Sequence, residues 1–242
     1  MCFNVAIYST IDKVEKKFSR SLNKPSLFSK YHFVSGFDHP WIPVISTSEP
    51  NQIKMMKWGL IPHWFSEYGN ENNMANKTLN ARCETLQEKK SFQVVSRNRC
   101  LVLINGFYEW NSSFGKKYPY YIQNETSEFL TLGGVWDSWL DQVGNEVQTF
   151  SIITTPANSQ METIHNTKKR MPLIIPEDRS NEWLSNFDVK KEIEPFLVPF
   201  QHNLKAYTVS SFINKPKNNR NIDKAHQNYN YPELDNPQLD LF

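Results

Sequence analysis

The chain has 242 residues, of which 39% are hydrophobic, and a formal net charge of +2. This length accommodates one large domain or two small ones. A charge so close to neutral excludes binding to nucleic acid through an overall cationic surface, so any DNA site must be a local patch. Aromatic residues make up 14% of the chain and only 8 residues are glycine, a mixture that favours strands over a helical bundle.

The three cysteines, Cys2, Cys83 and Cys100, are too few and too widely spaced for a disulfide framework or a zinc site. We therefore expect a reducing compartment, no metal and no cofactor. No apolar run approaches the roughly 18 residues that span a membrane, and the start of the chain lacks the apolar core of a signal peptide. These features predict a cytoplasmic, monomeric protein that does not bind membranes.

The first part of the chain predicts a short strand, a helix and loops. Residues 3–8 form an apolar run typical of a buried strand, and residues 10–19 have helical spacing with Thr10 as the N-cap. Residues 31–50 are rich in proline and aromatic residues and predict a loop with a strand near 43–46.

The second part is dominated by strands. Residues 100–155 contain β-prone runs separated by turn-like segments, including a hairpin turn at 141–144. Residues 177–197 predict helix, and 204–210 predict a last strand. After residue 213 the chain becomes polar and rich in asparagine, so we predict an α+β domain over 1–213, with a mostly antiparallel, barrel-like β core and a few peripheral helices, and a flexible tail over 214–242.

The most reactive candidate is Cys2. A small residue directly after Met1 favours removal of the initiator methionine, which leaves an amine and a thiol on the same residue. The amine, with a reference pKa of about 7.7–8.0, can form a Schiff base with an aldehyde, and the thiol can then close a thiazolidine ring. Taken alone, the position favours the other interpretation, a small buried hydrophobe at the start of a strand.

Six segments that follow in a fixed order decide between these interpretations. They are WGLIPHW (58–64), TLNARCET (78–85), CLVLINGFYEW (100–110), GGVWDSW (133–139), ITTPA (153–157) and IHNTKKRMPLII (164–175). Together with the initial Met-Cys they resemble the SRAP family, the SOS-response-associated peptidases or abasic-site processing proteins. The resemblance covers residues 1–213 and implies a sensor of abasic sites in single-stranded DNA that protects the lesion during replication.

The resemblance implies four catalytic residues. Cys2 matches the nucleophile that forms a thiazolidine crosslink with the ring-opened sugar, and Asn80 matches the residue that holds the abasic site. Glu109 matches the acid that moves protons, and His165 matches the histidine that assists ring opening near neutral pH. The alternatives are a turn or cap role for Asn80, an outward-facing strand position for Glu109 and a structural role for His165.

The resemblance also implies a DNA-binding surface. Arg82 matches an arginine that contacts phosphate, and Trp64 and Phe65 match an aromatic pair that lies against exposed bases. Arg170 and the lysines at 168–169 could extend the phosphate-binding surface. Core packing of the two aromatic residues and a simply solvated basic face are the alternatives.

The chain departs from the family pattern at its start. Family members commonly begin Met-Cys-Gly-Arg, whereas this chain has Phe3 and Asn4 at these positions. One phosphate contact is therefore in doubt. Cys83 and Cys100 lie inside the matching segments without a thiolate-activating context, so we interpret both as buried bystanders.

Two other functions fit the same residues. A peptidase or amidohydrolase could use the Cys2 thiol and amine for acyl transfer, with removal of its own Met1 as a minimal reaction. A non-covalent adaptor that binds single-stranded DNA would need no reactive cysteine.

The end of the chain carries a separate pattern. Gln238, Leu239, Asp240, Leu241 and Phe242 resemble the pentapeptide with which bacterial proteins bind the replicative sliding clamp. Two apolar anchors and one polar side chain on a flexible tether suit an apolar pocket, and such tethering would raise the local concentration of the protein at replication forks.

Deletion of residues 238–242 should abolish binding to purified sliding clamp in surface plasmon resonance, because it removes both apolar anchors. A deletion variant that binds the clamp like the full chain would contradict the proposed motif.

Overall fold

The computed structural model describes residues 2–185, 193–202 and 204–235. The strands are β1 (Asn4–Ile7), β2 (Ser21–Leu22), β3 (Tyr31–Ser35), β4 (Trp41–Ser46), β5 (Glu49–Trp58), β6 (Asn80–Arg82), β7 (Arg99–Ile104), β8 (Gly106–Ser113), β9 (Lys116–Asn124), β10 (Leu130–Leu140), β11 (Glu146–Pro156), β12 (Arg170–Pro172) and β13 (Leu204–Thr208). The short α-helices are α1 (Ile11–Phe18), α2 (Glu71–Lys77), α3 (Lys90–Gln93), α4 (Ser159–Ile164), α5 (Ser180–Leu184) and α7 (Pro232–Asp235). Within the described ranges, no helix is long and apolar enough to cross a membrane.

Five of the strands close into a barrel. The strands β11, β10, β7, β4 and β5 are neighbours in this order, and each of these pairs is antiparallel. A parallel pairing of β11 with β5, in which Phe150 lies opposite Trp58, joins the two ends of this order. Closure leaves the five strands without a free edge at this point, and the interior is filled by side chains because so small a barrel has no lumen.

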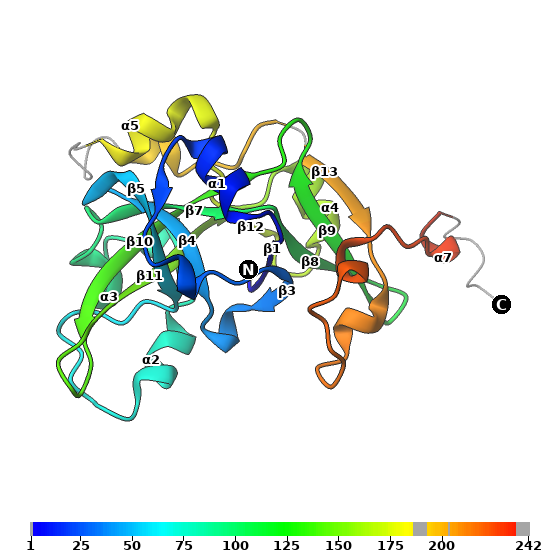
Figure 1. Cartoon of the computed structure of the whole chain (residues 1–242). Helices are drawn as coiled ribbons and strands as arrows, with labels where there is room; N and C mark the ends of the chain where they lie inside the picture. Colours follow the sequence, from blue (N-terminus) through cyan, green and yellow to red (C-terminus); the bar gives the residue numbers. More distant parts are fainter. Residues whose placement is uncertain (1, 186–192, 203, 236–242) are drawn as a thin grey trace.

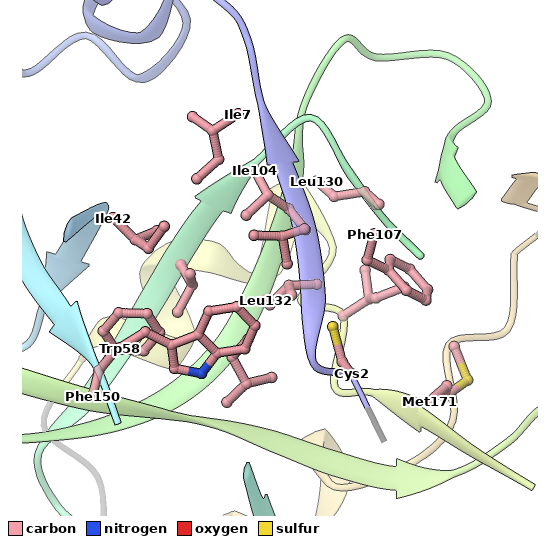
Figure 2. Close-up of a cluster of buried hydrophobic side chains, with 14 of the residues drawn as sticks. Cys2, Ile7, Ile42, Trp58, Ile104, Phe107, Leu130, Leu132, Phe150 and Met171 are labelled. Atoms are coloured by element: carbon pink, nitrogen blue, oxygen red, sulfur yellow. The ribbon is translucent and has the colours of Figure 1, made fainter. Parts of the chain in front are cut away.

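A second sheet packs against the barrel and contains the start of the chain. Its strand order is β13-β9-β8-β1-β3, and all of its pairs are antiparallel. Figure 1 shows β1 near the middle of the molecule, between the barrel strands and the strands β8, β9 and β13. One apolar cluster contains Ile7 and Phe107 from this sheet together with Ile104, Leu132 and Phe150 from the barrel (Figure 2).

The α+β class with a mostly antiparallel, barrel-like core is confirmed. The predicted first strand, the helix after it and the strands between residues 100 and 155 are all present. The Thr10 hydroxyl caps α1 by accepting a hydrogen bond from the Lys13 amide at 3.4 Å. The predicted turn at 141–144 connects β10 to β11, and Gly144 has a φ of 84° there, which glycine adopts without steric cost.

Two predictions differ from the structure. Residues 31–35 were expected in a loop but form β3, whose pairing with β1 is a contact that local sequence does not reveal. The predicted tail from residue 214 contacts the second sheet as far as Glu233, which accepts a hydrogen bond from Tyr118 at 3.2 Å. Within this segment Ala225 is fully buried, and Asn228 forms a bridge with Val209.

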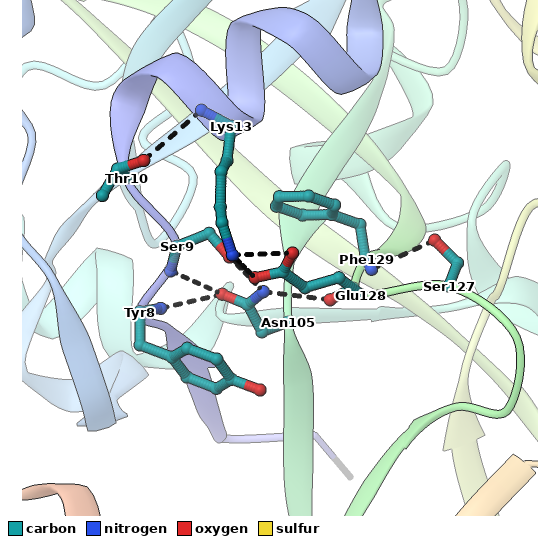
Figure 3. Close-up of polar contacts among 8 residues, drawn as sticks. All are labelled: Tyr8, Ser9, Thr10, Lys13, Asn105, Ser127, Glu128 and Phe129. Carbon is teal, nitrogen blue, oxygen red and sulfur yellow. Dashed lines mark hydrogen bonds and ion pairs between the residues drawn. The ribbon is translucent and has the colours of Figure 1, made fainter.

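A buried side chain fixes where β1 ends. Asn105, fully buried between β7 and β8, accepts hydrogen bonds from the Tyr8 and Ser9 amides at 2.8 and 3.1 Å through its Oδ1 atom. Its Nδ2 group donates to the Ser9 hydroxyl and to the Glu128 carbonyl (Figure 3). The same carboxamide thus forms hydrogen bonds with the backbone amides of Tyr8 and Ser9 and with the backbone carbonyl of Glu128.

Replacement of Asn105 by alanine should lower the free energy of unfolding by about 2–4 kcal/mol, because it leaves the buried Ser9 amide and the partly buried Tyr8 amide without this acceptor. Urea denaturation provides the measurement. Lys13→Ala, which removes only the exposed ion pair with Glu128, is the matched control and should cost less than about 1 kcal/mol. Equal losses in the two variants would contradict the role of Asn105.

Candidate active site

Cys2 precedes β1 and is the first residue that the structure describes. Its side chain is fully buried in the apolar cluster that also contains Phe107 and Met171 (Figure 2). Burial raises the pKa of the Cys2 thiol above its ordinary value, and the charge of Glu109 raises it further. The thiol is therefore protonated at neutral pH and needs a base to take its proton.

Asn80 holds the backbone at Cys2. It starts β6, which pairs in parallel with β11 so that Asn80 lies opposite Ile152. Its Nδ2 group donates a hydrogen bond to the Cys2 carbonyl oxygen at 2.9 Å. Among the described residues its Oδ1 atom is buried without a hydrogen-bond donor, so this acceptor is free for a bound molecule.

An acid and a histidine meet next to this backbone. Glu109 lies on β8, which pairs with β1 so that Tyr108 is opposite Asn4, and the register brings the residues before Asn4 alongside Glu109. His165 directly follows α4, and its Nε2 atom is 3.6 Å from a carboxylate oxygen of Glu109. Both side chains are buried, with 4% and 8% of the Glu109 and His165 side chains exposed.

The hydrogen bonds of His165 define its tautomer. Its Nδ1 atom is 2.9 Å from the carbonyl oxygen of Arg170, and a carbonyl can only accept, so Nδ1 carries the proton. In the neutral ring Nε2 is then unprotonated and faces Glu109. This arrangement lets the histidine accept a proton from the carboxyl group or from a molecule bound between them.

Burial favours the neutral form of both groups. It raises the pKa of the Glu109 carboxyl to about 7, because the charged form loses its hydration. It lowers the pKa of His165 from its ordinary value for the same reason. Near pH 7 the carboxyl exists in both forms and the imidazole is mostly neutral, a combination suited to general acid–base catalysis.

Glu109 and His165 open into a cleft of about 660 Å³. Its wall includes three aromatic residues, Phe3, Phe37 and Trp110, and the ring centroids of Phe3 and Phe37 are 5.2 Å apart. Three cationic side chains also line it, Lys117, Lys168 and Arg220.

A smaller pocket lies on another side of Phe3. It is lined by Phe3, Asn76, Lys77, Asn80, Arg82 and Lys89. Phe3 belongs to both walls, so cationic groups lie on either side of the residue that follows Cys2. The predicted Arg82 is exposed here, on the same strand as Asn80.

The other residues predicted to bind DNA do not line either of these pockets. Arg170 is buried and its guanidinium binds the Glu84 carboxylate and the Thr154 carbonyl, so it fastens β12 to β11. Phe65 is also buried, and its carbonyl accepts a hydrogen bond from the Trp139 indole.

Trp64 is 37% exposed with the Lys90 ammonium 4.4 Å above its ring, outside the walls of both pockets. Cys100 is fully buried as expected, whereas Cys83, which was also expected to be buried, is only partly buried. Gln238, Leu239, Leu241 and Phe242 lie outside the described residues.

Sequence reasoning missed several cleft residues. Phe3 was noted only as a departure from the family start, and Phe37 lies in a segment interpreted as loop. Arg220 belongs to the segment interpreted as a tail, and only its return to the cleft in three dimensions identifies it.

The fold and the site define a class: α+β proteins with a closed five-stranded barrel whose candidate active site forms around the start of the chain. The sequence model of the family described as "SOS response associated peptidase (SRAP)" matches residues 1–216 of this chain. The chain belongs to this family.

Its relatives span most of the sequence. It is 32% identical over 226 residues to the "Abasic site processing protein YoqW" of Bacillus subtilis, covering 90% of this chain and 96% of that protein. It is 31% identical over 232 residues to the "Abasic site processing protein HMCES" of Gallus gallus, covering 84% of this chain and 65% of that longer protein.

Solved structures agree with the fold. A crystal structure of a protein from Bacteroides thetaiotaomicron superposes with a TM-score of 0.86 at 32% identity, covering 95% of this chain and all of that one. A protein from Bordetella bronchiseptica has a TM-score of 0.74 at 20% identity and covers 86% of this chain, which supports the fold alone.

The raised pKa of Glu109 predicts a pH-dependent penalty on folding. The unfolded chain ionises this carboxyl near pH 4.5, whereas the folded chain holds the proton up to about pH 7. Stability is therefore lost as the pH rises from 4.5 through 7, and Glu109→Gln should remove the loss. We expect the variant to match the wild type near pH 4 and to exceed it by about 1–3 kcal/mol at pH 8 in urea denaturation.

The exposed Glu125→Gln substitution serves as the control and should give no difference that grows with pH. A Glu109→Gln variant that is less stable than the wild type at pH 8 would show that ionised Glu109 stabilises the fold.

Proposed function

We propose that this protein processes abasic sites in single-stranded DNA by forming a thiazolidine crosslink between Cys2 and the ring-opened sugar. The observation that carries the proposal is the convergence of three groups on the start of the chain. Asn80 bonds to the Cys2 carbonyl, while the buried Glu109 and His165 lie 3.6 Å apart in the adjoining cleft. Family membership and relatives named for abasic-site processing support the choice of substrate.

The chemistry begins once Met1 is removed. The amine of Cys2 adds to the aldehyde carbon of the open sugar, and loss of one water leaves an imine. The thiol then adds across the carbon–nitrogen double bond. A carbon–sulfur bond forms, the thiol proton ends on the nitrogen, and the product is a five-membered ring.

The buried pair supplies the proton transfers. The closed furanose has no aldehyde, so ring opening must come first, and it needs a base at the anomeric hydroxyl and an acid at the ring oxygen. The neutral His165 ring is suited to the first task and protonated Glu109 to the second. After ring opening, the Glu109 carboxylate, which has given its proton to the ring oxygen, can take the proton of the Cys2 thiol, whose pKa is raised by burial.

Asn80 orients the reacting residue. Its Nδ2 group fixes the Cys2 carbonyl, which restricts rotation of the amine and thiol. Its Oδ1 atom, which lacks a donor among the described residues, can accept a hydrogen bond from a hydroxyl of the lesion.

The surroundings suit a single strand. Lysines and arginines line the pockets on both sides of Phe3, as expected for a backbone that passes over Cys2. Phe37 is 52% exposed at the cleft and offers a ring on which a base can stack. A single strand requires no unpairing energy to present its sugar. A crosslink here would shield the lesion from cleavage and from error-prone copying during replication.

The test is a denaturing gel after incubation with an oligonucleotide that carries one abasic site. We expect a shifted band for the wild type and none for Cys2→Ala, because the alanine has no thiol to close the ring. Cys83→Ala is the matched control, since it removes a partly buried thiol outside the site and should leave the band unchanged. Glu109→Gln and His165→Ala should each slow the reaction by about 100-fold.

The same samples separate the alternatives. Binding in a native gel without a denaturation-resistant band would favour a non-covalent adaptor. Cleavage of a peptide substrate that depends on Cys2, without any adduct, would favour a peptidase or amidohydrolase. An adduct that persists in Cys2→Ala would move the nucleophile to another residue.

A further inference from the structure

Two histidines and an aspartate form a cluster away from the candidate active site. His32 lies on β3 of the second sheet, whereas Asp223 and His226 belong to a short 3₁₀ helix, Asp223–His226, in the C-terminal segment. Their side-chain nitrogen and carboxylate oxygen atoms all lie within 4.8 Å of one another. Folding brings these residues together across 194 positions of sequence.

The distances among the three groups match a coordination triangle. His32 Nδ1 is 3.0 Å from His226 Nε2, and Asp223 Oδ1 is 3.8 and 3.6 Å from these two nitrogens. A point equidistant from the three atoms lies about 2.0 Å from each, within the range of zinc–imidazole and zinc–carboxylate bonds.

The surroundings hold the three groups in place. The Asp223 Oδ2 atom accepts a hydrogen bond from Gln227 at 2.9 Å, which leaves Oδ1 directed at the histidines. The His226 ring stacks on Tyr8 with centroids 4.5 Å apart. The His32 main-chain amide donates to the Asn221 side chain at 2.7 Å. Such outer contacts are typical of ligands that are oriented before an ion binds.

The contact between the two histidine nitrogens also suits a metal, because they lie 3.0 Å apart. Without an ion, one of the two facing nitrogens must donate a hydrogen bond to the other. A divalent ion would use both lone pairs and would pair with the carboxylate charge.

We propose that His32, Asp223 and His226 bind one Zn²⁺ ion, with solvent at the fourth position. Two imidazoles and one carboxylate form a common donor set for this ion. The expectation of no metal rested on the scarcity of cysteines, which this site does not use. The ion would fasten the C-terminal segment to β3 of the second sheet.

Isothermal titration of the untagged full chain with ZnCl₂ tests the proposal. We expect one ion per chain, a rise in Tm on adding Zn²⁺, and the visible d–d bands of four-coordinate cobalt when Co²⁺ replaces Zn²⁺. Asp223→Asn, which changes an exposed carboxylate and leaves the packing intact, should weaken binding by about 10-fold or more, and His226→Ala should do so more strongly.

Two controls locate the ion. His202→Ala removes an exposed histidine outside the cluster and should leave the affinity unchanged. Cys2→Ala should also retain binding, which separates this site from the crosslinking chemistry. Absence of saturable uptake with Zn²⁺ in excess, or uptake that survives His226→Ala but not Cys2→Ala, would overturn the proposal.

Discussion

The antiparallel pairing of β1 with β8 and β3 is the constraint on which the rest of the structure depends. Most chains begin at the surface, but here the residues after position 1 enter an internal strand of a five-stranded sheet. Because Asn4 lies opposite Tyr108, the register of β1 against β8 determines where Cys2 lies relative to the residues of β8. The barrel then supplies Asn80 through β6, and the turn after α4 supplies His165.

Loss of hydration is the common cause of the chemistry at this site. It favours the neutral form of each ionisable group, so it raises the pKa of the Cys2 thiol and the Glu109 carboxyl and lowers that of the His165 ring. The result is a set of groups close together whose neutral forms are favoured, so proton transfer starts from uncharged groups in an apolar environment. Catalytic potential and cost to stability therefore arise from the same burial.

The sequence predicted the elements whose signals are local. The Thr10 cap, the turn at 141–144 and the long β-prone runs all depend on neighbouring residues, and all are present. The strand at 31–35 depends on its pairing with β1 and was missed. In the candidate site, the resemblance identified Asn80, Glu109 and His165, which do come together around Cys2. Arg170 was expected to extend the phosphate-binding surface, but it binds Glu84 and Thr154. That expectation failed because the local sequence does not distinguish a buried cation from an exposed one.

The return of the C-terminal segment to the cleft has a consequence for how such proteins diversify. The family match ends at residue 216, yet Arg220 lines the cleft from beyond this point. This segment packs on the second sheet and contributes no strand to the barrel. Substitutions at its exposed positions, such as Arg220, would alter one wall of the cleft, and with it the molecules that fit there, while the barrel strands keep their sequence.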